Sequence, residues 1–206
     1  LNPTKFMRST PIVIQSRIFM TCSPPRQGKT TWTVIDVSKQ AVVFIVNDIV
    51  ELTIPSELEN GLYRIQLDVY PEGNPANSVA KEAAIWITSS PLVVLIQGGQ
   101  RRSVPTAQEL VIDGSESKDP DDQYAYQHWN LKWTCMAYPQ KSGCFPPSLS
   151  NTTIATQDLK LAFSQENLTQ ADFYQFTLEI ESSGRRSKAQ QNITIIAFDA
   201  PKIIAK

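Results

Sequence analysis

The chain has 206 residues, of which 41% are hydrophobic, so it is long enough for two domains of about 100 residues with cores of their own. Its 19 basic and 20 acidic side chains nearly cancel, which removes the electrostatic argument for a nucleic-acid partner or an anionic membrane surface. The longest apolar run, residues 41–46, is far shorter than the roughly 20 residues of a membrane helix. The first residues lack the apolar core of a signal peptide, so a secreted or membrane-anchored parent implies an excised piece.

Apolar and polar side chains alternate along the first half of the chain, which is typical of half-buried strands. In GLYRIQLDV, Tyr63 and Ile65 point to one face and Arg64 to the other. The strands expected here are residues 11–15, 17–22, 30–37, 41–46, 50–54, 61–69 and 82–87. We expect Trp32 and Tyr63 in the core, and Trp86 with them.

The same pattern recurs, in the same order, in the second half. The strand GLYRIQLDV corresponds to DFYQFTLEI, and TTWTV around Trp32 corresponds to LKWTC around Trp133. A restart marked by proline follows the last strand of each half, at Pro91 and at Pro201. The chain is therefore a tandem of two β units.

The second unit has strands expected at residues 92–96, 109–113, 128–135, 159–163, 172–180 and 191–197. About seven short strands, with a tryptophan on the third and a tyrosine beginning the sixth, indicate an immunoglobulin-like or fibronectin III-like sandwich. We predict an all-β chain of two tandem sandwiches, with Trp133 and Tyr174 in the second core. The predicted domains are residues 1–89, residues 90–200, and the start of a following unit at residues 201–206.

Three cysteines leave one unpaired within the chain. Between Cys135 and Cys144 lies a segment with Pro139 and Gly143 that can fold back as a turn, so we predict a disulfide there. A bond closing so short a loop contributes about 2 to 3 kcal/mol and favours an oxidising compartment. Cys22 shares its alternation parity with apolar neighbours, and we expect a buried free thiol rather than a bond to a cysteine outside the chain.

Three sequons point the same way. Asn151, Asn167 and Asn192 each begin an Asn-X-Thr pattern of N-glycosylation. The first two lie in polar segments. Asn192 alternates with apolar residues, which places it on the outer face of a strand.

The acidic stretch DGSESKDPDDQ, residues 113–123, admits three interpretations. Asp119, Asp121 and Asp122 supply oxygens that calcium prefers, but the spacing of an EF-hand loop is absent. Catalysis is the weakest interpretation. A polar turn is favoured, because Pro120 fixes its own φ and Asp119 can bond the backbone two residues on.

Few residues suggest chemistry. The single histidine, His128, shares no local motif with a serine or cysteine, and three scattered cysteines give no zinc spacing. We therefore predict neither an enzyme nor a cofactor, calcium excepted. The basic pairs Arg101-Arg102 and Arg185-Arg186 are expected to be solvated loop residues.

The second unit carries a family resemblance. LVIDGSESKDPDDQ, then LKWTC and a nearby GC, resembles the signature of the receptor-for-egg-jelly (REJ) module of the polycystin and egg-jelly-receptor family. Its first part also resembles the polycystic-kidney-disease (PKD) domain. The motif covers about residues 108–145. The first unit keeps its tryptophan but lacks the acidic turn and the cysteine pair, which favours the REJ module, with its divergent fibronectin-like domains, over regular PKD repeats.

This resemblance implies a noncatalytic part of the ectodomain of a multi-pass membrane protein, at the extracellular face of the plasma or ciliary membrane. Such proteins act as receptors or assemble with cation channels, in cilia or at the sperm surface. The implied partners are neighbouring domains of the same ectodomain and an extracellular protein or glycan ligand. The tripeptide at His128 is HWN rather than HxT or HxS, so autoproteolysis is not assigned to this chain.

Two alternatives remain open beside this interpretation. One is an accessory PKD-like module of a secreted hydrolase that binds carbohydrate or collagen, which requires a row of solvent-facing aromatic residues. The other is an adhesion array made rigid by calcium at Asp119, Asp121 and Asp122, as in cadherin-like proteins.

Overall fold

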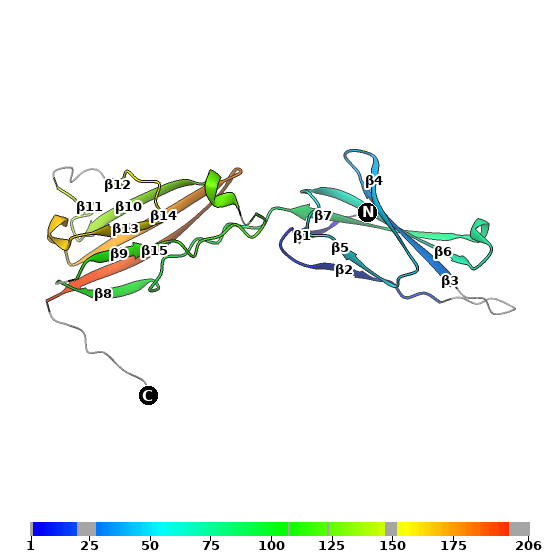
Figure 1. Ribbon diagram of the computed structural model, residues 1–206, viewed down its shortest axis with the longest axis horizontal. Coiled ribbons are helices and arrows are strands. Elements are labelled where there is room, and N and C mark those ends of the chain that lie inside the picture. The colour runs from blue at the N-terminus through cyan, green and yellow to red at the C-terminus, as the bar shows by residue number, and fades with distance from the viewer. Residues whose placement is uncertain (1, 20–27, 107, 123, 147–151, 198–206) are drawn as a thin grey trace, which may run out of the picture. The chain divides into compact units, whose positions relative to one another are not determined.

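The computed structural model describes residues 2–19, 28–106, 108–122, 124–146 and 152–197 (Figure 1). The chain divides into two compact units, Leu1–Ser90 and Pro91–Lys206. The described residues form strands and three short 3-10 helices, which confirms the all-β prediction. No helix in this part of the chain has the length and apolar character needed to cross a membrane.

The first unit places a five-stranded sheet, in the order β1-β7-β6-β3-β4, beside the two-stranded sheet β2-β5. Its elements are β1 (Thr4–Met7), β2 (Ile12–Gln15), β3 (Gly28–Asp36), β4 (Ala41–Asn47), β5 (Glu51–Ile54), β6 (Gly61–Pro71), η1 (Pro75–Asn77) and β7 (Val79–Thr88). Alternation decides which side chains meet between the sheets. Trp32 and Tyr63 from the large sheet and Leu52 from the small one are buried in a single cluster.

The second unit repeats this arrangement. Its large sheet has the order β11-β10-β14-β15-β8, with β12 also paired to β10, and its small sheet is β9-β13. The elements are β8 (Arg101–Pro105), β9 (Leu110–Asp113), η2 (Ala125–His128), β10 (Asn130–Tyr138), β11 (Ser142–Gly143), β12 (Thr153–Ile154), β13 (Lys160–Phe163), η3 (Gln165–Asn167), β14 (Phe173–Ser182) and β15 (Arg185–Ile196). Trp133, Phe176 and Leu178 of the large sheet bury themselves against Leu110 and Ile112 of β9.

Each unit carries a parallel strand at one edge of its large sheet. β1 pairs in parallel with β7 through four residue pairs, and β8 pairs in parallel with β15 through five. The remaining ladders are antiparallel. The repeat seen in the sequence is therefore a repeat of topology, with β1 equivalent to β8, β3 to β10, β6 to β14 and β7 to β15.

Several expectations were wrong. Residues 17–19 form no strand, and the rest of the strand expected at 17–22 lies outside the described residues. Residues 92–96 form only the isolated bridge between Val93 and Lys118, and the strands β1 and β8 were not expected. Trp86 is 44% exposed, because its neighbours Ile85 and Ile87 take the inner face of β7. The pairs Arg101-Arg102 and Arg185-Arg186 lie in β8 and β15 rather than in loops.

Candidate functional site

The acidic turn, residues 113–122, begins at a point of close packing. The Gly114 amide donates to the Leu159 carbonyl at 2.8 Å. A Cβ atom at Gly114 would lie 2.5 Å from Leu178 Cδ2, 3.1 Å from the Leu159 carbonyl oxygen and 3.3 Å from Trp133. Only glycine leaves room for the backbone to cross here, which explains why the acidic sequence begins Asp-Gly.

The middle of the turn pairs with the segment that enters the unit. The Val93 amide donates to the Lys118 carbonyl at 3.0 Å, and the Lys118 amide donates back to the Val93 carbonyl at 2.8 Å. The hydroxyl of the buried Ser117 accepts from the Leu95 amide at 3.0 Å and donates to the Leu95 carbonyl at 3.2 Å. The turn thus satisfies backbone groups that a neighbouring strand normally satisfies, and residues 92–96 need no sheet.

The end of the turn is a buried ion pair. Arg185, the first residue of β15, binds Asp119 in a bidentate manner, with Nη1 to Oδ1 at 2.9 Å and Nη2 to Oδ2 at 2.5 Å. The Asp119 side chain is 1% exposed and that of Arg185 is 20% exposed. The hydrogen bond to Asp119 raises the pKa of Arg185 above its ordinary value. This pair joins the acidic turn to the start of β15, far along the chain.

Of the other acids in the turn, Asp121 shares Arg185 with Asp119, whereas Asp113 and Asp122 accept from backbone amides. Asp121 lies 3.3 Å from Arg185 Nη1, whereas Asp122 Oδ1 accepts from the Tyr124 amide at 2.8 Å. Asp113 accepts from the Ser115 amide, and hydrogen bonding to Ser115 holds the pKa of Asp113 below its ordinary value. Among the described residues, no three acidic, histidine or cysteine side chains converge on one point. This geometry does not favour the predicted calcium site, which stays a prediction.

A calcium titration tests that site directly. We expect the melting temperature of the chain to stay constant between a chelator and about 5 mM calcium, because calcium must displace Arg185 from Asp119 before it can bind. Differential scanning calorimetry measures this, and Asp122→Asn serves as the control that changes the charge but not the ion pair. A calcium-dependent rise that Asp122→Asn abolishes would restore the calcium site.

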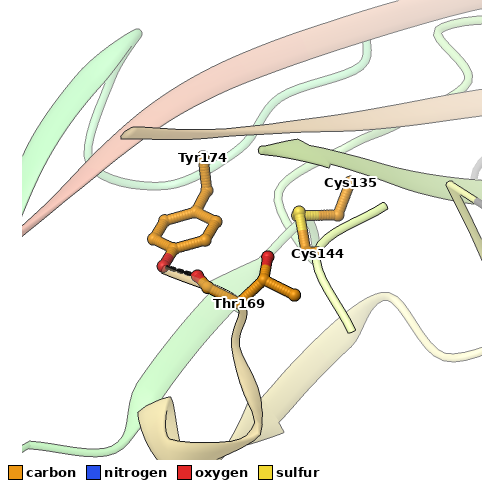
Figure 2. The surroundings of a disulfide bond; sticks show 4 residues. All are labelled: Cys135, Cys144, Thr169 and Tyr174. Carbon is orange, nitrogen blue, oxygen red and sulfur yellow. Dashed lines mark hydrogen bonds between the residues drawn. A yellow bond between two sulfur atoms is a disulfide. The ribbon is translucent and has the colours of Figure 1, made fainter. Parts of the chain in front are cut away.

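A second cluster surrounds the disulfide. Cys135 of β10 and Cys144 are bonded, and both are buried. Figure 2 shows the Tyr174 ring beside this bond, with its hydroxyl group donating to the Thr169 carbonyl. The Thr169 amide in turn donates to the Cys144 carbonyl at 2.9 Å. The disulfide and the tyrosine therefore hold the same loop from two sides.

The first unit contains the equivalent tyrosine without the disulfide. The Tyr63 hydroxyl donates to the Glu59 carbonyl at 2.9 Å, as Tyr174 does to Thr169. Such a bond from the start of the sixth strand back to the preceding loop is the tyrosine corner of immunoglobulin-like sandwiches. Burial raises the pKa of both tyrosines, so both stay protonated donors at neutral pH.

Loss of the tyrosine corner is expected to cost measurable stability. Tyr174→Phe leaves the Thr169 carbonyl without its donor, and we expect the free energy of unfolding of the second unit to fall by about 1 to 2 kcal/mol. Tyr138→Phe is the matched control, because the Tyr138 ring stacks on Phe173 and its hydroxyl makes no hydrogen bond in the described part of the chain. Urea unfolding measures both, and equal effects would contradict a role for the corner.

The tryptophans predicted for the core repeat in the same way. The Trp32 indole donates to the Ile49 carbonyl at 3.0 Å, and the Trp133 indole donates to the Asp158 carbonyl at 2.9 Å. Each buried ring thus has its polar atom satisfied by the chain that leaves the large sheet.

Two of the predicted glycosylation sites can be placed. Asn167 is exposed at the end of η3, and Asn192 is half-buried on β15. Asn151 and Cys22 lie outside the described residues.

Comparison with known proteins assigns the family. The model of the REJ domain matches residues 16–206. The chain belongs to the REJ domain family. This REJ domain is 30% identical to human polycystin-1 over 130 residues, which is 60% of the chain and 3% of that protein. It is 24% identical to the human polycystin family receptor for egg jelly over 165 residues, which is 73% of the chain and 7% of that protein.

Solved immunoglobulin-like and fibronectin-like structures also match the REJ domain, at low identity. The titin domains Z1Z2 in complex with telethonin are 12% identical, with a TM-score of 0.40 over 94% of the REJ domain and 92% of that chain. The Clostridium thermocellum CbhA fibronectin(III)-like modules are 7% identical, with a TM-score of 0.33 over 98% and 95%.

Arg185 is the site residue of the REJ domain that was missed in the sequence. A signal was present, because Arg185 shares its alternation parity with Gln191 and Ile193, both of which are buried. Counting back along β15 places Arg185 on the inner face. Asp119 could not be predicted as its partner in the same way. It lies in a turn, where no strand alternation shows which way a side chain points.

Proposed function

We propose that this REJ domain is a noncatalytic, extracellular module in the ectodomain of a polycystin-type membrane protein. It acts there as a structural spacer and as a binding surface for a ligand or partner. The observation that carries the proposal is the buried Cys135–Cys144 bond in a REJ domain, because such bonds persist in oxidising compartments. Each unit adds a tyrosine corner and a buried tryptophan, which suit a module that must keep its shape outside the cell.

The side chains of the acidic turn that could carry chemistry are engaged in structural hydrogen bonds instead. Asp119 and Arg185 neutralise each other in a bidentate pair, and Ser117 has both of its hydrogen bonds to Leu95. These groups serve the fold of the acidic turn. The family match favours this proposal over an accessory module of a secreted hydrolase.

Strand β4 supports the binding part of the proposal. It lies at the edge of its sheet and carries no charged residue, and Val42, Val43 and Ile45 are exposed on it. Sheet edges without charge or proline pair readily with strands of other chains. We propose that an extracellular protein ligand, or a neighbouring domain of the same ectodomain, meets the first unit at β4. Association of the parent protein with a cation channel subunit is part of the same proposal.

Placement outside the cell is tested on intact cells. A protease recognition site inserted after Gly73, in the exposed segment between β6 and β7, goes into the full-length membrane protein that carries this chain. We expect protease added outside unpermeabilised cells to cut it. Cutting only after permeabilisation would overturn the extracellular assignment, and the same site placed in a known cytosolic loop is the control for leakage.

The spacer role is tested by stretching the single chain. We expect one discrete unfolding event for each unit. Reduction of the disulfide should lengthen the event of the second unit by about 25 Å, because it frees the residues between Cys135 and Cys144. Cys135→Ser with Cys144→Ser should show the same added length without reductant. Smooth extension without discrete events would contradict a load-bearing spacer.

A further inference from the structure

Asn192 lines a hollow in the outer face of the second unit. The hollow has a volume of about 440 Å³, and it is lined by Arg101, Arg102, Ser103, Phe173, Asn192 and Thr194. That volume falls in the range in which proteins hold small ligands. Three strands contribute its walls, namely β8, β14 and β15.

The strand register explains how these side chains come together. Asn192 pairs with Gln175 of β14 on one side and with Arg101 of β8 on the other. Thr194 pairs with Ser103 one step along the same face. Phe173 lies two residues before Gln175, which makes it the diagonal neighbour of Asn192, within reach for an aromatic ring.

The Phe173 ring is held in a fixed orientation. It stacks on Tyr138 of β10, with ring centres 4.6 Å apart and planes 6° from parallel. Tyr138 pairs with Phe173 across the ladder of β10 and β14. The stack leaves Phe173 as a rigid apolar wall at the border of a hollow whose other walls are polar.

The Asn192 side chain is oriented for attachment of a sugar. Its Oδ1 accepts from Gln175 Nε2 at 3.2 Å, which turns the carboxamide nitrogen, the atom that carries an N-glycan, away from Gln175. Thr194 completes the sequon and is exposed. The side-chain nitrogen of Asn192, Nδ2, makes no hydrogen bond in the described part of the chain, whereas its backbone amide donates to the Gln100 carbonyl.

We propose that the hollow binds the first sugar of an N-glycan attached to Asn192. The apolar face of the N-acetylglucosamine ring packs on Phe173, and its acetamido and hydroxyl oxygens accept from Arg101 and Ser103. The sugar therefore covers a polar hollow of the sheet and stabilises the second unit. This inference rests on the extracellular placement under the proposed function, since N-glycans are added in the secretory pathway.

Asn167 offers an internal comparison. It is exposed at the end of the three-residue helix η3, where its backbone amide bonds the Ser164 carbonyl. A sugar there would extend into solvent. We therefore expect glycans at both positions but stabilisation only from the glycan on Asn192.

The experiment begins with the whole 206-residue chain, secreted from cells that make only high-mannose glycans. Mass spectrometry of glycopeptides reports occupancy, and endoglycosidase H then trims each glycan to one N-acetylglucosamine. In a background with Asn151→Gln and Asn167→Gln, we expect the trimmed protein to melt about 3 °C higher than the same protein with Asn192→Gln. With Phe173→Ala added to both, the difference should fall below about 1 °C.

Arg101→Ser provides a second route, because Arg101 is exposed and its replacement leaves the core intact. It should reduce the stabilisation and speed release of the Asn192 glycan by peptide N-glycosidase F under native conditions. If Asn167 carries a glycan and Asn192 does not, the proposed sugar-binding site is wrong and the proposed function is unaffected. Absence of glycan at both positions overturns this sugar-binding site, whereas the extracellular placement stands or falls with the protease experiment on intact cells. Stabilisation that Phe173→Ala and Arg101→Ser leave unaltered also overturns the site.

Discussion

Replacing Arg185 with methionine is expected to lower the free energy of unfolding of the second unit by about 3 kcal/mol. The substitution keeps the length of the side chain but removes the cation that faces Asp119, whose side chain is almost fully buried. Asp119 would keep the Asp121 amide, which donates to its Oδ1 at 3.0 Å, but this one hydrogen bond does not offset the lost solvation of a buried carboxylate. Urea unfolding, followed by hydrogen exchange of peptides from each unit, measures the effect on the second unit separately.

The neighbouring arginine supplies a matched control. Arg186 pairs with Glu181 at 2.7 Å and Glu179 at 3.1 Å, but its side chain is 63% exposed. Arg186→Met should therefore cost less than about 1 kcal/mol. In Asp119→Asn with Arg185→Met both charges are gone, and we expect part of the lost stability to return. Equal effects at the two arginines would contradict a buried structural ion pair.

Gly114→Ala is expected to destabilise the second unit by about 3 kcal/mol. The added methyl group meets Leu178 at 2.5 Å and the Leu159 carbonyl at 3.1 Å. Leu178 is fully buried, and the Leu159 carbonyl already accepts the Gly114 amide, so neither can move away without disturbing the core. The same unfolding experiment reports the change.

Gly61 is the matched control for this substitution. A Cβ atom there meets the Tyr63 ring at 3.6 Å, which is ordinary van der Waals contact. Gly61→Ala should change the stability of the first unit by less than about 1 kcal/mol. If Gly114→Ala were as mild as Gly61→Ala, the close crossing at the start of the acidic turn would be refuted.

Strands with strict alternation could be predicted from the sequence because their pattern is local. Residues 61–69 lie within β6, and residues 173–180 of the predicted range 172–180 lie within β14; in both strands inward-facing apolar side chains alternate with outward-facing ones. The repeated tryptophans and tyrosines could be predicted for the same reason, since the large sheets bury one face of each strand. Alternation along β7 also placed Trp86 outside, a signal that was outweighed by the expectation that tryptophan is buried.

The remaining features depend on partners far along the chain. β1 and β8 are short and mixed in character, and they become strands only by pairing with β7 and β15. The apolar residues 92–96 read as a strand, but they bond to the acidic turn instead. The bond between Arg185 and Asp119 likewise follows from tertiary folding, which no local pattern encodes.

The parallel edges of the two units affect how each resists tension. A pull on the amino end of β1 and the carboxyl end of β7 drives the two strands past each other along their length. The four residue pairs between them are then loaded in shear, all at once, rather than unzipped one after another. β8 and β15 present five such pairs. Forced unfolding is governed by the rate of this first rupture rather than by the free energy of unfolding. A module of low thermodynamic stability can therefore still resist force.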